Sequence, residues 1–122
     1  MIKQRRGTAI VEMPEGILLA AMRNGKFLLP GGRAEKGESR FRAAIRELEE
    51  ETGLVACYAK TIFQHESHSQ RHLVVLIKAH GTPKPGCEIK HITFYQEGRK
   101  LRMSGGTKDI LRKYFEWKRR PD

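Results

Sequence analysis

Glutamates crowd into one short stretch of an otherwise basic chain, at Glu47, Glu49, Glu50 and Glu51. In a helix, the spacing i, i+3, i+4 places Glu47, Glu50 and Glu51 on one face, and we call these three the aligned glutamates. Glu49 points away from them. Like charges at this spacing destabilise a helix by about 0.2–0.5 kcal/mol per pair. The negative C-terminal end of the helix dipole disfavours them further, so a compensating positive charge is needed.

Two partners could supply that charge. Basic neighbours such as Arg46 would leave a solvated acidic face that has no chemical role. A divalent cation would compensate better, because three converging carboxylates suit a hard, oxygen-preferring ion such as Mg²⁺ or Mn²⁺. The glutamates alone leave both interpretations open.

The flanking residues favour a site over a surface. Gly31 and Gly32 allow the backbone to approach a ligand closely, and a carbonyl there could add an oxygen ligand. Glu38 lies just before the expected helix, and the guanidinium fork of Arg46 can hold carboxylates in a fixed geometry.

Together these residues fill every signature position of the Nudix box. The stretch reads Gly32, five residues, Glu38, seven residues, Arg46-Glu47-Leu48, one residue, Glu50-Glu51, one residue and Gly53-Leu54. The sequence therefore resembles the Nudix hydrolase family. The order of its surrounding elements is also similar to that of the family's single domain.

The resemblance implies an enzyme that cleaves a diphosphate linked to another group, using water and Mg²⁺, with Mn²⁺ as an alternative. It implies that the aligned glutamates Glu47, Glu50 and Glu51 hold the ion and that the Gly31 carbonyl is a further ligand. Glu38 is expected to be a supporting or outer-metal carboxylate. Arg46 is expected to position a helix carboxylate.

The identity of the general base stays open between two regions. Within the box, Glu50 or Glu47 is favoured, because a carboxylate beside an ion-held water can accept its proton. Outside the box, Glu88 is the best candidate for a base or an extra ligand, since it precedes an expected strand as a functional glutamate does in some relatives. Glu97 is the next candidate.

The expected substrate is a nucleoside di- or triphosphate or a related nucleoside diphosphate derivative. The signatures of narrower substrate classes are missing. The proline that ADP-ribose pyrophosphatases carry downstream of the box is absent where this chain reads His68-Ser69-Gln70-Arg71, and no tyrosine occurs there. The chain therefore resembles nucleoside triphosphate pyrophosphohydrolases best.

Several other residues could contact this substrate. Aromatic residues could stack on a base or belong to the core: Phe27, Phe63 and Tyr95. Basic residues could contact phosphates: Arg5, Arg6, Arg23, Lys26 and Arg71. Three histidines have no partner at metal-ligand spacing and are expected in a substrate cleft or in solvent: His65, His68 and His72.

The elements that must position these residues follow from local patterns. Alternating and β-branched runs predict strands at residues 8–13, 16–22, 26–29, 54–63, 73–79 and 89–95. Asn24-Gly25 predicts a hairpin turn between the second and third of these, and Pro30-Gly31-Gly32 opens a loop. A helix is expected over residues 40–52, capped by Ser39 and stopped by Gly53.

A last helix completes the expected fold. It is capped by Thr107 and carries an apolar stripe that packs on the core: Ile110, Leu111, Tyr114, Phe115 and Trp117. The predicted fold class is α/β. The resemblance makes it a Nudix-type α/β/α sandwich with a mixed central β-sheet, a box helix and a C-terminal helix.

Composition bounds the remaining alternatives. With 122 residues, the chain is expected to form one domain over 1–122, and no apolar run is long enough to span a membrane. Cys57 and Cys87 lack metal-site spacing, which predicts reduced thiols in the cytoplasm. Many relatives form dimers, so a monomer or a homodimer is expected.

The net charge of +10 keeps an RNA-directed alternative open. One form is a basic nucleic-acid-binding module, supported by Lys118-Arg119-Arg120 near the C-terminus. The other is a hydrolase that acts on the 5′ end or cap of RNA. A small phosphorylated substrate is preferred, because a simple binding module has no need for three aligned glutamates.

Overall fold

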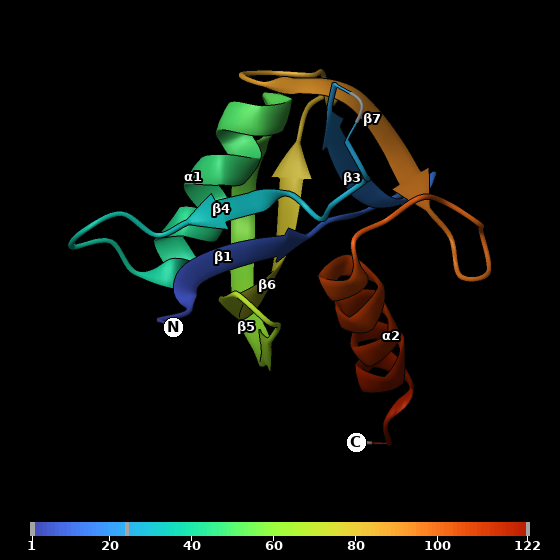
Figure 1. Cartoon of the computed structure of the whole chain (residues 1–122). Coiled ribbons are helices and arrows are strands. Elements are labelled where there is room, and N and C mark those ends of the chain that lie inside the picture. Colours follow the sequence, from blue (N-terminus) through green and yellow to red (C-terminus); the bar gives the residue numbers. More distant parts are fainter. Residues whose placement is uncertain (1, 24, 122) are drawn as a thin grey trace.

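The computed structural model describes residues 2–23 and 25–121. Its elements follow one another as β1 (Gln4–Ile10), β2 (Glu12–Met13), β3 (Gly16–Met22), β4 (Gly31–Arg33), α1 (Arg40–Thr52), β5 (Val55–Glu66), β6 (Gln70–His80), β7 (Ile89–Tyr95) and α2 (Gly105–Arg119). The strands β5 and β6 run between the two helices (Figure 1). This arrangement confirms the predicted α/β class with its box helix and C-terminal helix.

The strands form two sheets. In the four-stranded sheet the order is β4-β1-β6-β5, and β1 is antiparallel to β4 but parallel to β6, so the sheet is mixed as predicted. In the three-stranded antiparallel sheet the order is β2-β3-β7. The parallel pair brings residues 4–10 beside residues 70–76, which lie far apart in the sequence.

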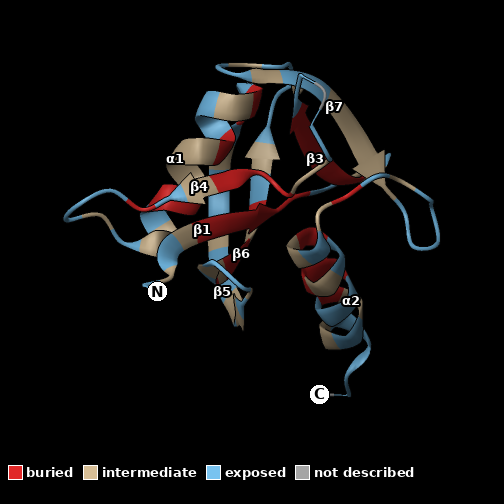
Figure 2. Cartoon of the chain, viewed as in Figure 1, coloured by how far each residue is buried: buried red, intermediate tan, exposed pale blue. Residues whose placement is uncertain are grey.

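Alternate residues of β1 face the two helices, as the two-residue period of a strand requires. Ala9 and Val11 pack in a core cluster with Ala44 and Leu48 of α1. Ile10 packs in a second cluster that contains Ile110, Leu111 and Tyr114 of α2. Figure 2 shows this burial concentrated along β1 and β3 and on the inner side of α2. The predicted apolar stripe of the last helix is therefore core, with Phe115 and Trp117 partly buried.

Gly7 is the point of closest approach between β1 and α1. A Cβ atom at Gly7 would lie 2.1 Å from the carbonyl oxygen of Arg40 and 2.4 Å from the amide nitrogen of Ala44. Only glycine fits against a helix backbone at this distance. The sheet consequently lies directly on the first turns of α1, which fixes the helix relative to β1 and β4.

Local signals set the ends of α1. The Ser39 side chain accepts a hydrogen bond from the backbone N–H of Arg42, and Gly53 ends the helix with a left-handed φ of 74°. Both residues act as the sequence predicts, and the helix bounds are the predicted ones.

The segment after β3 differs from the sequence prediction. Residues 26–29 form only isolated bridges, antiparallel between Ala20 and Leu28 and parallel between Phe27 and Met103. Of the predicted hairpin turn, Asn24 lies outside the described residues, and the Gly25 N–H donates to the Met22 carbonyl. The hairpin prediction was wrong in extent, because Phe27 takes a partner from the segment before α2.

Two further predictions were wrong, one at Gly31–Arg33 and one at the start of α2. Gly31–Arg33, predicted as loop, is the edge strand β4, since it pairs with β1 despite its low strand propensity. The cap of α2 is Ser104 rather than Thr107, and the helix starts at Gly105. Among the described helices, none is long and apolar enough to cross a membrane.

Candidate active site

The C-terminal half of α1 presents its glutamates to a cavity of about 250 Å³, which we call the carboxylate cavity. The aligned glutamates all line it, as the helical spacing predicts, and Glu49 does not. Its lining residues are Met22, Glu47, Glu50, Glu51, Cys87, Glu88 and Ile89. The structure therefore places three of the predicted ligands in one cavity with Glu88, whereas Gly31 and Glu38 are not among its lining residues.

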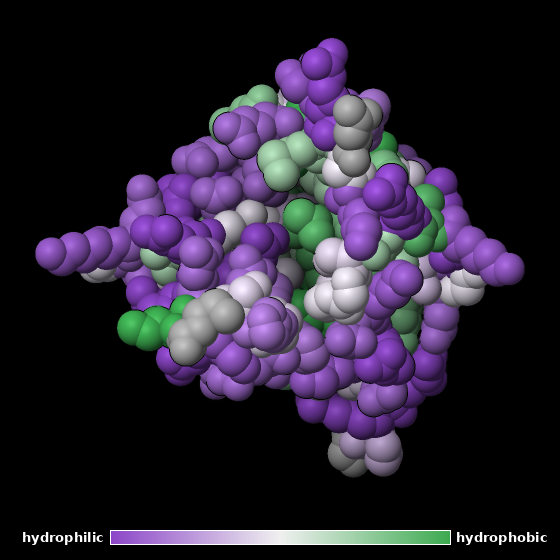
Figure 3. Space-filling view, in the orientation of Figure 1, coloured by the Kyte–Doolittle hydropathy of each residue, from purple (hydrophilic) through white to green (hydrophobic). Residues whose placement is uncertain are grey.

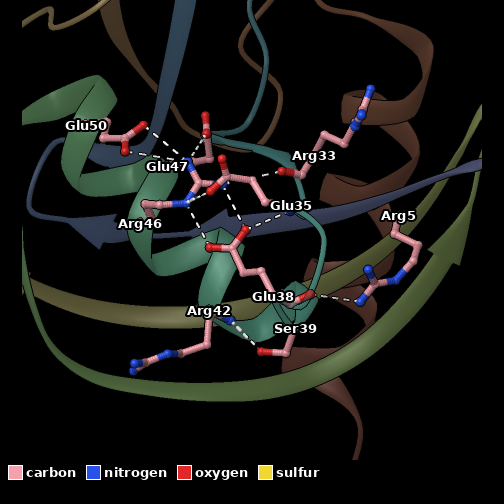
Figure 4. Close-up of polar contacts among 9 residues, drawn as sticks. All are labelled: Arg5, Arg33, Glu35, Glu38, Ser39, Arg42, Arg46, Glu47 and Glu50. Carbon is pink, nitrogen blue, oxygen red and sulfur yellow. Dashed lines mark hydrogen bonds and ion pairs between the residues drawn. The ribbon is translucent and has the colours of Figure 1, made fainter.

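Arg46 is the centre of an ion-pair network beside this cavity (Figure 4). Its Nε and Nη2 bond the two Glu38 carboxylate oxygens at 2.8 and 2.9 Å. Its Nη1 lies 2.6 Å from Glu47 Oε1 and 3.3 Å from Glu50 Oε1. One guanidinium thus ties the loop before α1 to two of the aligned glutamates.

This network fixes the charge of Glu38. Hydrogen bonds from the Arg46 side chain and from the Glu35 backbone N–H lower the pKa of Glu38 to about 2. The hydrogen bond to the Glu38 carboxylate in turn raises the pKa of Arg46. Glu38 is therefore an anion near pH 7 and is held by Arg46 through two hydrogen bonds.

Glu51 has the opposite environment. Burial is the largest cause that raises its pKa to about 7, and the nearby Glu47 carboxylate adds to the shift. The Gly31 N–H donates to Glu51 Oε1 at 3.2 Å, which opposes the shift. Because Gly32 has no side chain, it leaves room for the Glu47 carboxylate, from which a Cβ at this position would lie only 2.5 Å away. A half-buried carboxylate beside a second one lacks full charge compensation.

The donor set fits a hard divalent cation. Four glutamates line one cavity, and oxygen donors with an uncompensated charge are what Mg²⁺ and Mn²⁺ prefer. Among the described residues, no three Asp, Glu, His or Cys side chains converge closely enough to hold an ion as they stand. Arg46 lies between Glu47 and Glu50 and compensates part of their charge in this structure.

The loop before β7 places Glu88 at this cavity. The Lys84 N–H donates to the Thr52 carbonyl, and the Gly86 N–H donates to the Glu51 carbonyl, both at 2.8 Å. These bonds satisfy carbonyls that the end of a helix leaves free. A Cβ at Gly86 would lie 2.5 Å from the Glu50 carbonyl oxygen, so the loop packs directly on α1.

Glu97, the second candidate outside the box, is not brought to this cavity. It follows β7 and forms a two-bond ion pair with Arg119 of α2 at 3.0 and 2.9 Å. It lines a different cavity, together with Tyr95 and Phe115. Its carboxylate is engaged in holding α2 to the end of β7.

A larger cavity of about 530 Å³ lies on the α2 side of the four-stranded sheet, and we call it the polar cavity. Figure 3 shows the protein hollowed near the centre of this view, with apolar side chains inside and polar ones around them. The cavity is lined by Arg6, Thr8, Leu28, Leu29, Ser67, His68, Ser69, Gln70, His72, Ser104, Gly105, Gly106, Thr107, Asp109 and Ile110.

His72 forms the buried wall of the polar cavity. Its Nδ1 is 2.7 Å from Thr8 Oγ1, and its Nε2 is 3.5 Å from Ser67 Oγ. Burial, together with the smaller effects of the Arg6 and His65 charges, lowers the pKa of His72 to about 4. His72 is therefore neutral near pH 7. Neither buried nitrogen of the neighbouring His65 ring has a hydrogen-bond partner among the described residues, and the exposed His68 also lines the cavity.

A third, smaller cavity borders both the carboxylate cavity and the polar cavity. Its lining shares Met22, Glu51 and Ile89 with the carboxylate cavity. It shares Arg6, Leu28 and Leu29 with the polar cavity. The three cavities are therefore neighbours, and we call them together the groove; it extends from the aligned glutamates past Arg6 to the start of α2.

Sequence reasoning identified the aligned glutamates and Glu88 at one end of this groove. At the other end it named Arg6, His68 and His72 as possible substrate contacts, without showing that they share a cavity. Phe27 and Phe63, expected as stacking residues, pack against the core, and Tyr95 lines another cavity. Ser67, Gln70 and Gly106 were not predicted to contribute. The alternation of β1 puts Arg6 and Thr8 on one face, but nothing local shows that this face meets α2.

Comparisons with known proteins extend over most of the chain. Residues 3–109 match the family model described as the NUDIX domain. A structure of a Nudix hydrolase family member from Chromobacterium violaceum is 38% identical, with a TM-score of 0.92 over 98% of this chain and 81% of that one.

Two further relatives carry a more specific name. An ADP-ribose pyrophosphatase from Methanocaldococcus jannaschii is 29% identical over 89% of this chain and 71% of its own length. The structure of an ADP-ribose pyrophosphatase from Streptococcus suis has a TM-score of 0.77 over 98% of this chain and 94% of that one. At 19% identity, that second likeness concerns the fold alone.

Proposed function

The chain belongs to the Nudix hydrolase family, and from this premise we propose that it hydrolyses a diphosphate bond in a nucleoside diphosphate derivative with the help of a divalent cation. Nudix hydrolases act on small nucleotide substrates and generally use divalent metals. The resemblance deduced from the box is thereby confirmed, whereas the cation, the catalytic residues and the substrate of this chain are parts of the proposal.

One observation carries the proposal. Glu47, Glu50, Glu51 and Glu88 line a single cavity, and a smaller cavity borders both it and the polar cavity. A diphosphate linked to another group needs both parts. Its phosphates require charge compensation at one end, and its second moiety requires space and hydrogen-bonding groups at the other.

The aligned glutamates and the Gly31 carbonyl would hold Mg²⁺ or Mn²⁺, with Glu38 in the supporting role. When bound, the cation supplies charge neutralisation for the phosphates and acidifies a water molecule. Glu50 is the preferred proton acceptor, with Glu47 as the alternative inside the box, because Glu50 is exposed in the same cavity. Glu88 is the preferred candidate outside the box. Arg46 would act by positioning Glu47 and Glu50.

The polar cavity would take the group beyond the diphosphate. Its wall offers hydroxyl, amide and imidazole groups, and its floor is formed by Leu28, Leu29 and Ile110. The archaeal relative named ADP-ribose pyrophosphatase supports a nucleoside diphosphate sugar as the first substrate to test. Nucleoside triphosphates, favoured by the missing downstream proline, are the second.

The test is a substrate panel with purified protein and Mg²⁺ or Mn²⁺. It contains ADP-ribose, nucleoside di- and triphosphates, dinucleoside polyphosphates and RNA with a 5′ triphosphate or cap. We expect turnover of at least one nucleoside diphosphate derivative that EDTA abolishes. If no diphosphate is hydrolysed with either cation, the proposed function is wrong.

Two matched variants test whether Glu50 takes part in the reaction. Glu50→Gln is expected to lower kcat by about 100-fold or more, the range of a general base or an electrostatic group. Glu49→Gln, on the same helix turn, is the control and should keep the rate within about twofold, because Glu49 faces away and accepts from the Ala56 N–H. An unchanged rate in Glu50→Gln contradicts the assignment.

A specific observation keeps RNA ends in the panel. Arg5, Arg40 and Arg71 lie near one another at the start of α1. Besides burial, which is the largest cause, the charges of Arg71 and Arg5 lower the pKa of Arg40. Such a basic cluster attracts polyanions. Preferential turnover of 5′-triphosphate RNA over free nucleotides, with a steep dependence on salt, would favour this second candidate.

We also propose a reducing, cytoplasmic setting, as both cysteines are free and exposed thiols in the structure.

A further inference from the structure

Arg6 occupies the junction of the groove. It lies on β1 and lines both the polar cavity and the smaller cavity that Glu51 also lines. It is the only lysine or arginine among the described residues that line these two cavities and the carboxylate cavity. In a chain with 24 Lys and Arg residues, the groove has thus kept a single permanent cation.

The side chain of Arg6 is fixed by hydrogen bonds to uncharged groups, and the charges of Glu51 and Glu47 act on it only from beyond ion-pair distance. Its Nε donates to Thr8 Oγ1 at 3.3 Å, and its Nη2 donates to the Leu29 carbonyl at 3.1 Å. Among the described residues, no carboxylate lies within ion-pair distance of it. A guanidinium has five N–H donors in a planar fork, so donors remain for a ligand in the groove.

The charges along the groove are asymmetric. Four glutamates stand at one end, and the polar cavity beyond Arg6 contains one acidic residue, Asp109. A cation at the glutamates can bind only the phosphate that lies there. A second phosphate, placed toward the polar cavity, would find no lysine or arginine other than Arg6 among the described lining residues. A guanidinium suits phosphate because it can donate two parallel bonds.

We propose that Arg6 binds the phosphate on the polar-cavity side of the diphosphate and thereby sets the position of the substrate in the groove. This inference rests on the proposed function and adds a specificity-determining residue to it. Its consequence is a requirement for two adjacent phosphates, one on each side of the junction.

The variants are Arg6→Gln and Arg6→Lys. The control is Arg33→Gln, because Arg33 pairs with Arg6 across the β1–β4 ladder, is exposed and lines none of the three cavities. Figure 4 shows the Arg33 side chain turned away from the ion-pair network. The Arg33 carbonyl, which accepts from Arg46, is unchanged by this substitution.

Two measurements are combined. Calorimetric binding of ADP in EDTA reports the phosphate contact without any cation, and steady-state kinetics on a diphosphate substrate separate KM from kcat. We expect Arg6→Gln to weaken ADP binding and to raise KM by about 10- to 100-fold, the range for hydrogen bonds to charged groups. The ADP affinity and the KM of Arg6→Lys should lie between those of wild type and Arg6→Gln, and those of Arg33→Gln should match wild type.

Three results would overturn the inference. They are an unchanged ADP affinity in Arg6→Gln, an unchanged KM, or a loss that Arg6→Lys shares in full together with a lowered Tm, which would indicate a structural role. The proposed function fails separately. If wild type hydrolyses no diphosphate but binds ADP in an Arg6-dependent way, the phosphate contact stands without the hydrolase.

Discussion

The two sides of the four-stranded sheet are built differently. On the α1 side, glycines let backbones and carboxylates approach to distances that no Cβ would allow, at Gly7 against Ala44 and at Gly32 against Glu47. On the α2 side, the same sheet leaves a cavity of about 530 Å³ next to the start of the helix. A Cβ at Gly106 on that side would meet only ordinary contacts, at 3.8 Å from His72 Nε2.

The difference separates two requirements of an enzyme. The α1 side needs carboxylates in fixed positions, and tight packing on backbone supplies them. The α2 side needs room for a ligand, so it has polar walls and few atoms that would clash with an added group. Four substitutions test whether this contrast holds, and they are ordered from the largest expected effect to the smallest.

Gly7→Ala should give the largest effect. The new Cβ would lie 2.1 Å from one α1 backbone atom and 2.4 Å from another, and backbone cannot move aside cheaply. We expect the free energy of unfolding to fall by about 3 kcal/mol or more, measured by urea denaturation. A loss below about 1 kcal/mol would show that α1 can shift off the sheet and that this side is not tightly fixed.

Gly32→Ala should separate activity from stability. Its Cβ would lie 2.5 Å from the end of the flexible Glu47 side chain, which can turn away. We expect kcat/KM to fall by about 100-fold, because a displacement of about 1 Å at a reacting centre has that effect. The Tm should move little. Retained activity would mean that the position of Glu47 does not matter.

His72 should make stability depend on pH. Its pKa is about 4 in the fold, whereas an unfolded histidine titrates near 6.5, so below that pH only the unfolded chain takes up the proton. Stability is therefore lost as the pH falls from about 6.5 toward 4. We expect this group to contribute a loss of about 2 kcal/mol between pH 7 and pH 5.

The variant His72→Gln should remove that part of the pH dependence, and the exposed His68→Gln should not. Urea denaturation of all three proteins at both pH values gives the comparison. If wild type and His72→Gln lose the same free energy between pH 7 and pH 5, His72 is not the buried neutral group described above.

Gly106→Ala should have the smallest effect and the opposite sign. The Cβ fits at 3.8 Å from His72, and alanine restricts the unfolded chain more than glycine does. We expect a gain of about 0.5 kcal/mol in stability and a change in KM of less than about threefold. A tenfold rise in KM would show instead that the substrate fits closely against the first turn of α2.

The sequence predicted the α1 side far better than the α2 side, for physical reasons. The bounds of α1 depend on Ser39 and Gly53 and on the helical spacing of its glutamates, which are all local. The strands β3 and β7 also have their predicted bounds, because their apolar runs end at turn residues.

Long-range pairing decides the rest. Gly31–Arg33 is a strand because it pairs with β1. Phe27 is not part of the expected hairpin because it pairs with Met103. The polar cavity combines β1, the segment after β3, the turn between β5 and β6, and the start of α2. No local pattern encodes such a combination. The sequence therefore named Arg6, His68 and His72 as possible substrate contacts but could not show that they share one cavity.

The parallel register of β1 and β6 has a consequence for how the groove comes into being during folding. Arg6 stands opposite His72, a partner that the chain reaches only after α1 and β5 have been formed or passed. Closing such a long loop costs entropy before any contact rewards it, which makes parallel pairing slow. We therefore expect the β1–β6 pairing, and with it the junction at Arg6, to be completed in a slow step of refolding, so that the groove forms only once the two distant segments have met.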